Sequence, residues 1–463
     1  MAQATGSVRP TVGSAILLAT IWMAALPACA QTIRESAQAA IRTNPRVDVV
    51  TNNRQAIEQE LARARGQYLP QVDLRAGAGP EYTYNNGTRS SRNGGSETLL
   101  RTEAVVTATQ RVFDGWETDS EVERQKARGV SAARRVGETS ETIALDAIEA
   151  HIDVVRQRQL LRLAEDNVEV HRQMLQRVRQ RARGGAAGSS DIDQVQARLD
   201  TAIASASETR GALQDAENRY LYVVNQRAGQ LAPPDMPPSA LPGTLDDAVE
   251  RARRQNRTIK VNEADVVVAD REIDLADASF YPRLNLELVG ALNNDLDGVK
   301  GPDNNAAALL VFRWNLYRGG SDIAQRRVAL GRMSQAMAQR SVAFRQAEEE
   351  TRRSWVAFQT TTDRLPSLQS AVLQNRSVRD AYTRQFFDLG QRSLIDVLNA
   401  ENELYVSSGR LVSAQQARVF AAYRLFAAMG ELVTQLALDI PPEADERKPA
   451  AIPEDPRPRN APR

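Results

Sequence analysis

Cysteine, histidine and long apolar runs are almost absent from the chain. Its 463 residues include one cysteine, Cys29, and two histidines, His151 and His171. So few thiol and imidazole groups leave no ligand set for a structural zinc site, and no disulfide is needed for folding. We therefore expect no metal site and no cofactor, and we predict that His171 is a packed core residue.

The longest apolar run, Ala15 to Leu26, is too short to cross a bilayer, which takes about 20 residues. It follows Arg9 and precedes Ala28-Cys29-Ala30, a small-x-small pattern typical of secretory signal peptides. We predict a signal peptide over residues 1–30 that is cleaved after Ala30. The alternative is a lipoprotein signal, with Cys29 as the first mature residue. No later stretch predicts a transmembrane helix, so we expect an exported protein.

The chain also lacks an excess of positive or negative charge. Lys and Arg number 59 and Asp and Glu 58, and Arg9 is the only charged residue in the predicted signal. A neutral mature chain does not predict a nucleic-acid partner. The arginines at 134–135 and 177–183 are interpreted as solvated helix faces. No nucleophile–base pair, phosphate loop or ligand cluster is apparent, so we do not expect an enzyme.

The chain contains a long internal repeat. The same spacing separates Asn44 from Asn256 and Pro70 from Pro282, and Ile192-Asp193 recurs as Ile395-Asp396. Duplicated halves are common in transport proteins. We divide the chain into repeat 1 (31–228), a proline-rich linker (229–243), repeat 2 (244–435) and a proline-rich tail (436–463) that is predicted to be disordered.

Long helices dominate both repeats. Glu117 to Arg183 contains no proline and would approach about 100 Å as one helix. Ser321 to Asp388 is its counterpart in repeat 2. Apolar residues between Ile192 and Val223 recur at steps of three and four, which is heptad spacing. Such rods belong to coiled coils or extended bundles rather than to a compact domain.

Two β-hairpins interrupt the helices, at about 71–112 and 283–316. Apolar and polar residues alternate in both, and each strand has about 10 residues, the length of a tilted membrane strand. Four strands cannot close a membrane barrel, whose smallest forms have about 8, and open edges in lipid leave costly unpaired backbone groups. If the hairpins enter a membrane, several copies must share one barrel, and three copies with about twelve strands is the simplest solution.

These features resemble the TolC family of outer-membrane factors over nearly the whole predicted mature chain. The motifs that carry the resemblance are Asn44-Pro45, Tyr68-Leu69-Pro70-Gln71, Val112-Phe113-Asp114-Gly115, Tyr281-Pro282, Leu316-Tyr317-Arg318-Gly319-Gly320 and the run from Gly390 to Ala400. The resemblance implies a mainly α fold with membrane β. Its expected assembly is a homotrimer with a 12-stranded β-barrel in outer-membrane lipid and a long α-helical barrel across the periplasm.

The resemblance also implies site residues at the periplasmic tip. Asp396 matches an aspartate that forms an acidic ring at the channel entrance, and Asn399 replaces a second one. Arg392 and Asp193 match links that hold the tip closed, and Phe387 replaces the tyrosine that assists them. Each has a simpler interpretation: Asp396 as an acid favoured in the first turn of a helix, and Arg392 and Asp193 as solvated tip residues.

The leading functional hypothesis is a passive export duct that needs a periplasmic adaptor and an inner-membrane ABC or proton-driven transporter. The run from Arg392 to Leu404 is most similar to members that serve type I protein secretion. Multidrug efflux is the alternative, and a lipidated Cys29 would favour it. A hypothesis of a different class is a periplasmic coiled-coil adaptor or scaffold, since adaptors also carry long helical hairpins.

Overall fold

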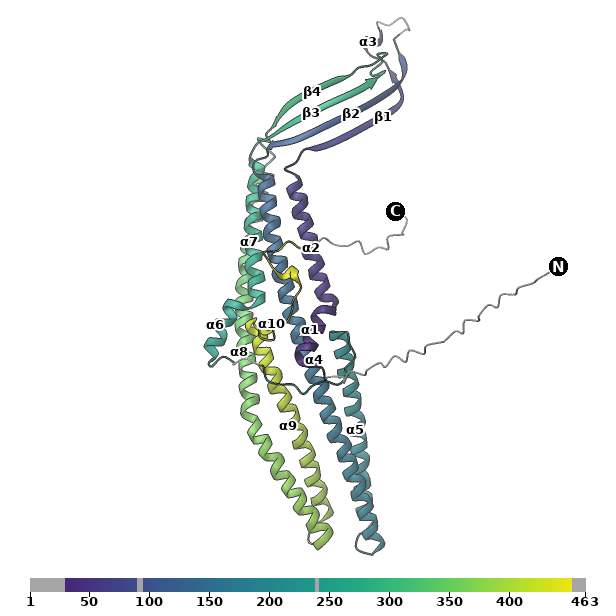
Figure 1. Ribbon diagram of the computed structural model, residues 1–463, viewed down its shortest axis with the longest axis vertical. Coiled ribbons are helices and arrows are strands. Elements are labelled where there is room, and N and C mark those ends of the chain that lie inside the picture. Colours follow the sequence, from purple (N-terminus) through teal and green to yellow (C-terminus); the bar gives the residue numbers. More distant parts are fainter. Residues whose placement is uncertain (1–29, 90–94, 238–240, 452–463) are drawn as a thin grey trace, which may run out of the picture.

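The computed structural model describes residues 30–89, 95–237 and 241–451. The molecule is a long rod of helices with a β-sheet at one end and two helical turns at the other (Figure 1). In these three ranges no helix combines the length and apolar character needed to cross a membrane. The predicted signal peptide up to Cys29 lies outside the described residues, and Ala30 is exposed.

The two halves repeat one order of elements: a short helix, a longer helix, a β-hairpin and two long antiparallel helices. The first half contains α1 (Ile33–Thr43), α2 (Pro45–Gly66), β1 (Gln71–Thr83), the short α3 (Asn86–Arg89), β2 (Glu97–Phe113), α4 (Glu117–Arg183) and α5 (Ser189–Val224). The second contains α6 (Leu245–Gln255), α7 (Arg257–Asp277), β3 (Arg283–Asn294), β4 (Asn305–Arg313), α8 (Ser321–Arg384) and α9 (Leu394–Met429), followed by α10 (Leu432–Gln435). The predicted fold class, mainly α with four strands and an internal duplication, is confirmed.

An asparagine joins the first two helices of each half. Asn44 caps α2 by accepting from the backbone N–H of Arg46, and Asn256 caps α7 by accepting from that of Ile259. Their amide groups also donate to the ends of the long hairpins, at the carbonyls of Val223 (3.0 Å) and Ala428 (2.9 Å). One side chain therefore ends a short helix, begins the next and anchors a third.

The four strands form one antiparallel sheet in the order β1-β2-β3-β4. The central pair, β2 with β3, joins the hairpins of the two repeats. Except at the bulge at the end of β2, where Phe113 is opposite Leu284, odd-numbered residues pair with odd-numbered ones, as in Gly77 with Glu103, so they share one face of the sheet. β1 and β4 are the two edges.

The helical core is rich in alanine, and its largest cluster combines residues of both halves, such as Ile148 of α4 and Phe426 of α9. Val195, Leu199 and Ala202 of the predicted heptad seam are buried. His171 is buried as predicted, and His151 lies in a buried network in which the Ser36 hydroxyl is 2.8 Å from His151 Nδ1 and 2.9 Å from the Tyr220 hydroxyl. Burial lowers the pKa of both imidazoles, which favours their neutral forms.

The prediction of a disordered tail is wrong for residues 436–451. Leu436 and Leu438 are buried in the core, and Glu443 accepts a hydrogen bond from Gln55 at 3.0 Å. The backbone of Asp439 bonds to Gln38 in both directions. These apolar and polar contacts compensate for ordering a proline-rich segment. Residues 452–463 of the predicted tail lie outside the described residues.

The arginine clusters are not simply solvated. Arg134 forms an ion pair with Glu446 of the C-terminal segment (2.8 Å) and donates to the carbonyl of Lys260. Arg135 forms an ion pair with Asp265 of α7 at 2.6 Å. The guanidinium groups therefore tie α4 to its neighbours, which the sequence alone did not indicate.

Candidate functional site: the helical tip

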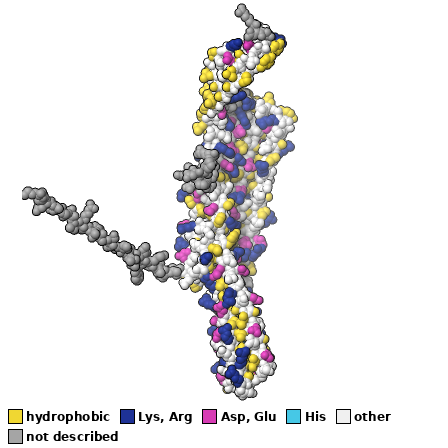
Figure 2. Space-filling model, turned by 90° about the vertical axis from the view of Figure 1, so that its right-hand side faces the viewer, with side chains coloured by type: hydrophobic (Ala, Val, Ile, Leu, Met, Phe, Trp, Pro, Cys, Tyr) yellow, Lys and Arg dark blue, Asp and Glu magenta, His cyan; other side chains and the backbone are white. Residues whose placement is uncertain are grey.

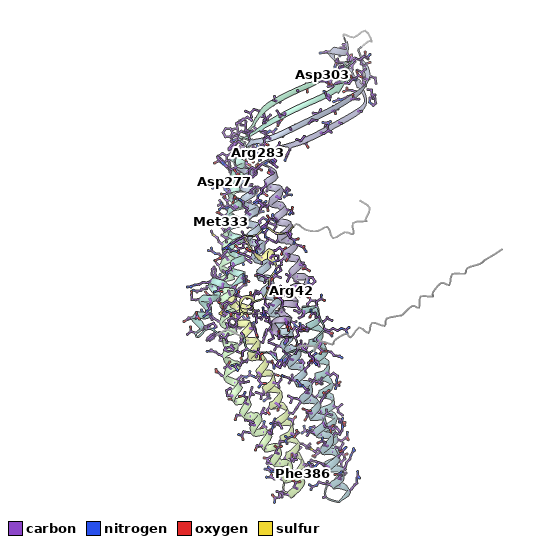
Figure 3. The ribbon with its side chains drawn as sticks, in the orientation of Figure 1. Arg42, Asp277, Arg283, Asp303, Met333 and Phe386 are labelled. Carbon is purple, nitrogen blue, oxygen red and sulfur yellow. The ribbon has the colours of Figure 1, made fainter. Side chains whose placement is uncertain are left out.

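Two turns lie close together at the end of the rod opposite the sheet, where Phe386 is labelled in Figure 3. One joins α4 to α5, and Gly185 at φ +74° supplies its left-handed residue. The other follows α8 through a π-helical turn, η2 (Gln385–Leu389), which ends at Gly390 with φ +63°. Ser393 then caps α9.

An apolar cluster packs the two turns together. It combines residues of both repeats: Met174, Leu175 and Val178 of α4, Val195 and Leu199 of α5, Phe386 of η2, and Leu394, Val397 and Leu398 of α9. The tip is therefore a packed unit of two helical hairpins. Any movement of one hairpin against the other must disturb this cluster.

Asp396 lies in the first turn of α9 and is about two-fifths exposed. The Ser393 hydroxyl donates to its carboxylate at 2.8 Å and accepts from its backbone N–H at 3.3 Å. Arg392 approaches the same carboxylate at 3.6 Å, donates to Gln385 at 3.2 Å and lies over the ring of Tyr382. Within one copy, Asp396 is thus an acid in the first turn of a helix that Ser393 caps, as in its simpler interpretation, and its second carboxylate oxygen has no hydrogen bond to the described residues.

The other expected site residues are spread around the tip. Asn399 is exposed and accepts a hydrogen bond from Arg198 of α5 at 3.5 Å. Phe387 is stacked under the guanidinium of Arg177, 3.7 Å from its ring centre. Asp193 is exposed, and its side chain has no hydrogen bond or ion pair within the described ranges. Arg392 and Asp193 do not meet within one copy.

Two arginines of the cluster at 177–183 are not simply solvated, because they hold the two hairpins together. Arg181 of α4 donates to the carbonyl of Phe386 at 2.5 Å, and its guanidinium lies 4.7 Å from the ring of Phe386. It also reaches the carbonyl of Phe387 at 3.5 Å. Arg181 and Arg177 both contact η2, where the π-helical geometry changes the usual pattern of backbone hydrogen bonds. We define Arg177, Arg181 and η2 as the tip clamp.

Beside the clamp, a 460 Å³ cleft opens between α4, α8 and α9. Glu401 lines it with a side chain that is 7% exposed, and Arg379 pairs with it at 3.2 Å. Burial raises the pKa of Glu401, while Arg379 opposes that shift. The described residues include no group of three or more His, Cys, Asp or Glu side chains placed to hold a metal ion.

The profile of the family "Outer membrane efflux protein" matches residues 37–222 and 248–431, so it covers both repeats. The outer membrane efflux protein BepC of Brucella suis is 23% identical over 93% of this chain and 92% of its own. The outer membrane protein TolC of Vibrio cholerae is 25% identical over 89% and 93%. The alkaline protease secretion protein AprF of Pseudomonas aeruginosa is 22% identical over 83% and 82%.

Solved structures show the same fold. The crystal structure of the Campylobacter jejuni CmeC outer membrane channel superposes with a TM-score of 0.75 at 13% identity, covering 86% of each chain. The hypothesis of a coiled-coil adaptor is therefore not supported, because the profile match and the fold both point to outer membrane channels.

Proposed function

Since this chain belongs to the outer membrane efflux protein family, we propose that three copies of it form one continuous passive duct across the outer membrane and the periplasm. The observation that carries this proposal is that the charged side chains of the sheet are confined to one of its two faces. Every charged residue of the four strands lies at an odd position and hence on one face: Asp73, Arg75, Glu81, Glu97, Arg101, Glu103, Arg111, Arg283, Glu287 and Arg313.

The opposite face suits lipid. It carries exposed apolar side chains, including Val72 (67%), Leu74 (72%), Leu292 (66%), Leu310 (64%) and Phe312 (63%). Apolar side chains are also plentiful over the sheet in the space-filling view (Figure 2). A strand that alternates apolar with polar residues fits a wall with lipid on one side and water on the other.

One copy cannot complete that wall. β1 and β4 leave one unpaired edge each, and such edges are costly in lipid. Pairing β1 of one copy with β4 of the next closes the sheet, and three copies supply about twelve strands, within the range of known membrane barrels. The helices agree with such contacts, because α8 exposes Val328, Met337, Val342 and Val356 along its length.

At the tip, a threefold arrangement would bring three Asp396 carboxylates towards the axis, with Asn399 one turn further along α9. Converging carboxylates attract cations and repel anions. The Asp193 side chain has no hydrogen bond or ion pair to the described residues of its own copy, which leaves it available to pair with Arg392 of a neighbouring copy. Phe387 lacks a hydroxyl and stacks on Arg177 instead. The tip clamp would then hold each copy in the closed position.

We propose protein export by a type I secretion system as the cargo route, with a periplasmic adaptor and an inner-membrane transporter as partners. Support comes from the run from Arg392 to Leu404 and from the similarity to AprF, a protease secretion protein. Multidrug efflux stays the second candidate, because BepC is an efflux protein by name. A deletion strain distinguishes them: protein secretion requires a specific protein to vanish from the medium, whereas efflux requires increased drug sensitivity.

The channel itself is tested in planar lipid bilayers. Protein purified from outer membranes should insert and produce discrete, small conductance steps, because the tip is closed at rest. Addition of Mg²⁺ on the side of the tip should reduce the current through its binding at Asp396. A protein that never inserts, at any concentration or voltage, would contradict the proposal.

A further inference from the structure

The charged face of the sheet carries a chain of ion pairs at some distance from the tip. The Arg101 guanidinium contacts Glu103 at 2.6 Å and Glu81 at 3.1 Å, and Arg75 approaches the other oxygen of Glu103 at 3.7 Å. Glu81 in turn accepts from the backbone N–H of Asp297 at 3.2 Å. We call Arg75, Glu81, Arg101 and Glu103 the wall network.

Glu103 is the centre of the wall network. Its side chain is 16% exposed, whereas that of Arg75 is 83% exposed and that of Arg101 is 35% exposed. One carboxylate therefore lies close to the sheet between two guanidinium groups that extend over it. Because each arginine is balanced by an acid in contact with it, the network has no net charge.

A glycine, Gly77, provides the space in which Glu103 lies. On β1, Gly77 is opposite Glu103, and Gly79 is opposite Arg101. A Cβ at Gly77 would be 3.3 Å from Glu103 Oε1, so this side chain rests directly on the bare backbone. A side chain that lies flat against the sheet, as that of Glu103 does, leaves the water-filled space above it open.

We propose that the wall network sets the charge selectivity of the membrane-embedded section of the duct, with Glu103 as the residue that neutralises it. This rests on the proposed function, since only a closed trimer turns the charged face into the wall of a pore. Three copies would then form a neutral belt that neither traps nor excludes a charged cargo. The acidic ring at the tip would then be the section of the duct that discriminates between cargoes by charge.

Removal of the Glu103 charge changes this balance. In Glu103→Gln, Arg101 keeps its ion pair with Glu81 and Arg75 loses its ion pair, so each copy gains one positive charge and the trimer gains three. Fixed charge along a narrow, water-filled wall concentrates ions of opposite sign. The belt would then attract anions, although the strands and the tip are unchanged.

The test is the reversal potential of the reconstituted protein in a KCl gradient. We expect Glu103→Gln to raise the chloride-to-potassium permeability ratio about twofold or more. Arg101→Gln should shift it the opposite way, and the double variant should return to the wild-type ratio. Glu103→Asp, which keeps the charge, serves as the matched control and should stay near wild type.

The outcomes separate the two proposals. If wild-type protein forms no channel, the proposed function fails, irrespective of Glu103. If channels form and Glu103→Gln leaves the permeability ratio unchanged, or the double variant behaves like Glu103→Gln alone, the wall network has no role in selectivity. Heat-sensitive trimers on gels, required of every variant, show that a change in selectivity does not come from misassembly.

Discussion

Arg181→Ala should loosen the closed tip. The lost bond joins a charged donor to the carbonyl of Phe386 at 2.5 Å, and the guanidinium also leaves the face of that ring. A hydrogen bond to a charged group contributes about 1.5–3 kcal/mol and a cation–π contact about 0.5–1 kcal/mol. If opening breaks both contacts, the variant shifts the equilibrium towards the open tip by about 2–4 kcal/mol, or roughly 30- to 900-fold.

Single-channel recordings at fixed voltage measure that shift as open probability, and sensitivity of cells to a large antibiotic reports it in vivo. Arg183→Ala is the matched control, since this exposed arginine of the same helix end has no hydrogen bond or ion pair to the described residues. Arg181→Lys keeps the charge without the planar stack and should be intermediate. If Arg181→Ala and Arg183→Ala behave alike, the clamp does not hold the tip.

Three further predictions concern the pore, the core and the backbone. Asp396→Asn should weaken Mg²⁺ block at least about tenfold if three carboxylates bind the ion, and unchanged block removes Asp396 from the constriction. Burial raises the pKa of Glu141 to about 7, so the folded protein binds this proton more tightly than the unfolded chain does. The free energy of unfolding should therefore fall as the pH rises from about 4.5 to 7. Glu141→Gln should therefore raise the melting temperature at pH 8 and change it little at pH 4, and an equal gain at both values would refute the assignment. Gly430 has φ +77°, and an added Cβ would be 2.4 Å from the carbonyl oxygen of Gln255. Gly430→Ala should therefore lower the free energy of unfolding, measured by thermal unfolding, by about 3 kcal/mol or more. Gly331→Ala is the control and should not destabilise the protein, because Gly331 has a helical backbone and open space around it.

The elements themselves were predictable because their signals are local. The long helix from Glu117 to Arg183 has no proline, and it begins and ends at the predicted residues. The four strands follow from period-two alternation. α5 begins at Ser189 instead of Ile192, because the Asp191 carboxylate accepts from the backbone N–H of Gly188 and adds a first turn.

The contacts that build the tip were not predictable in this way. Arg181 binds main-chain carbonyls about half the chain away. Because every residue has a main-chain carbonyl, the sequence does not show which of them accepts a hydrogen bond from an arginine. The π-helical turn has no local signature either. In the C-terminal segment, the prolines favour disorder in the sequence-based prediction. Leu436 and Leu438 are buried instead, because they pack into a core that is formed by residues elsewhere in the chain.

The proposed duct requires several copies of the chain to share one wall. Its most direct test is the copy number of the protein extracted from outer membranes in mild detergent, measured by native mass spectrometry. Cysteines introduced into β1 and β4 add a second readout, since Cys29 is the only native cysteine. A shared wall predicts three chains per particle, with disulfide cross-links between copies. A single chain that stays in solution without detergent and never cross-links would contradict it.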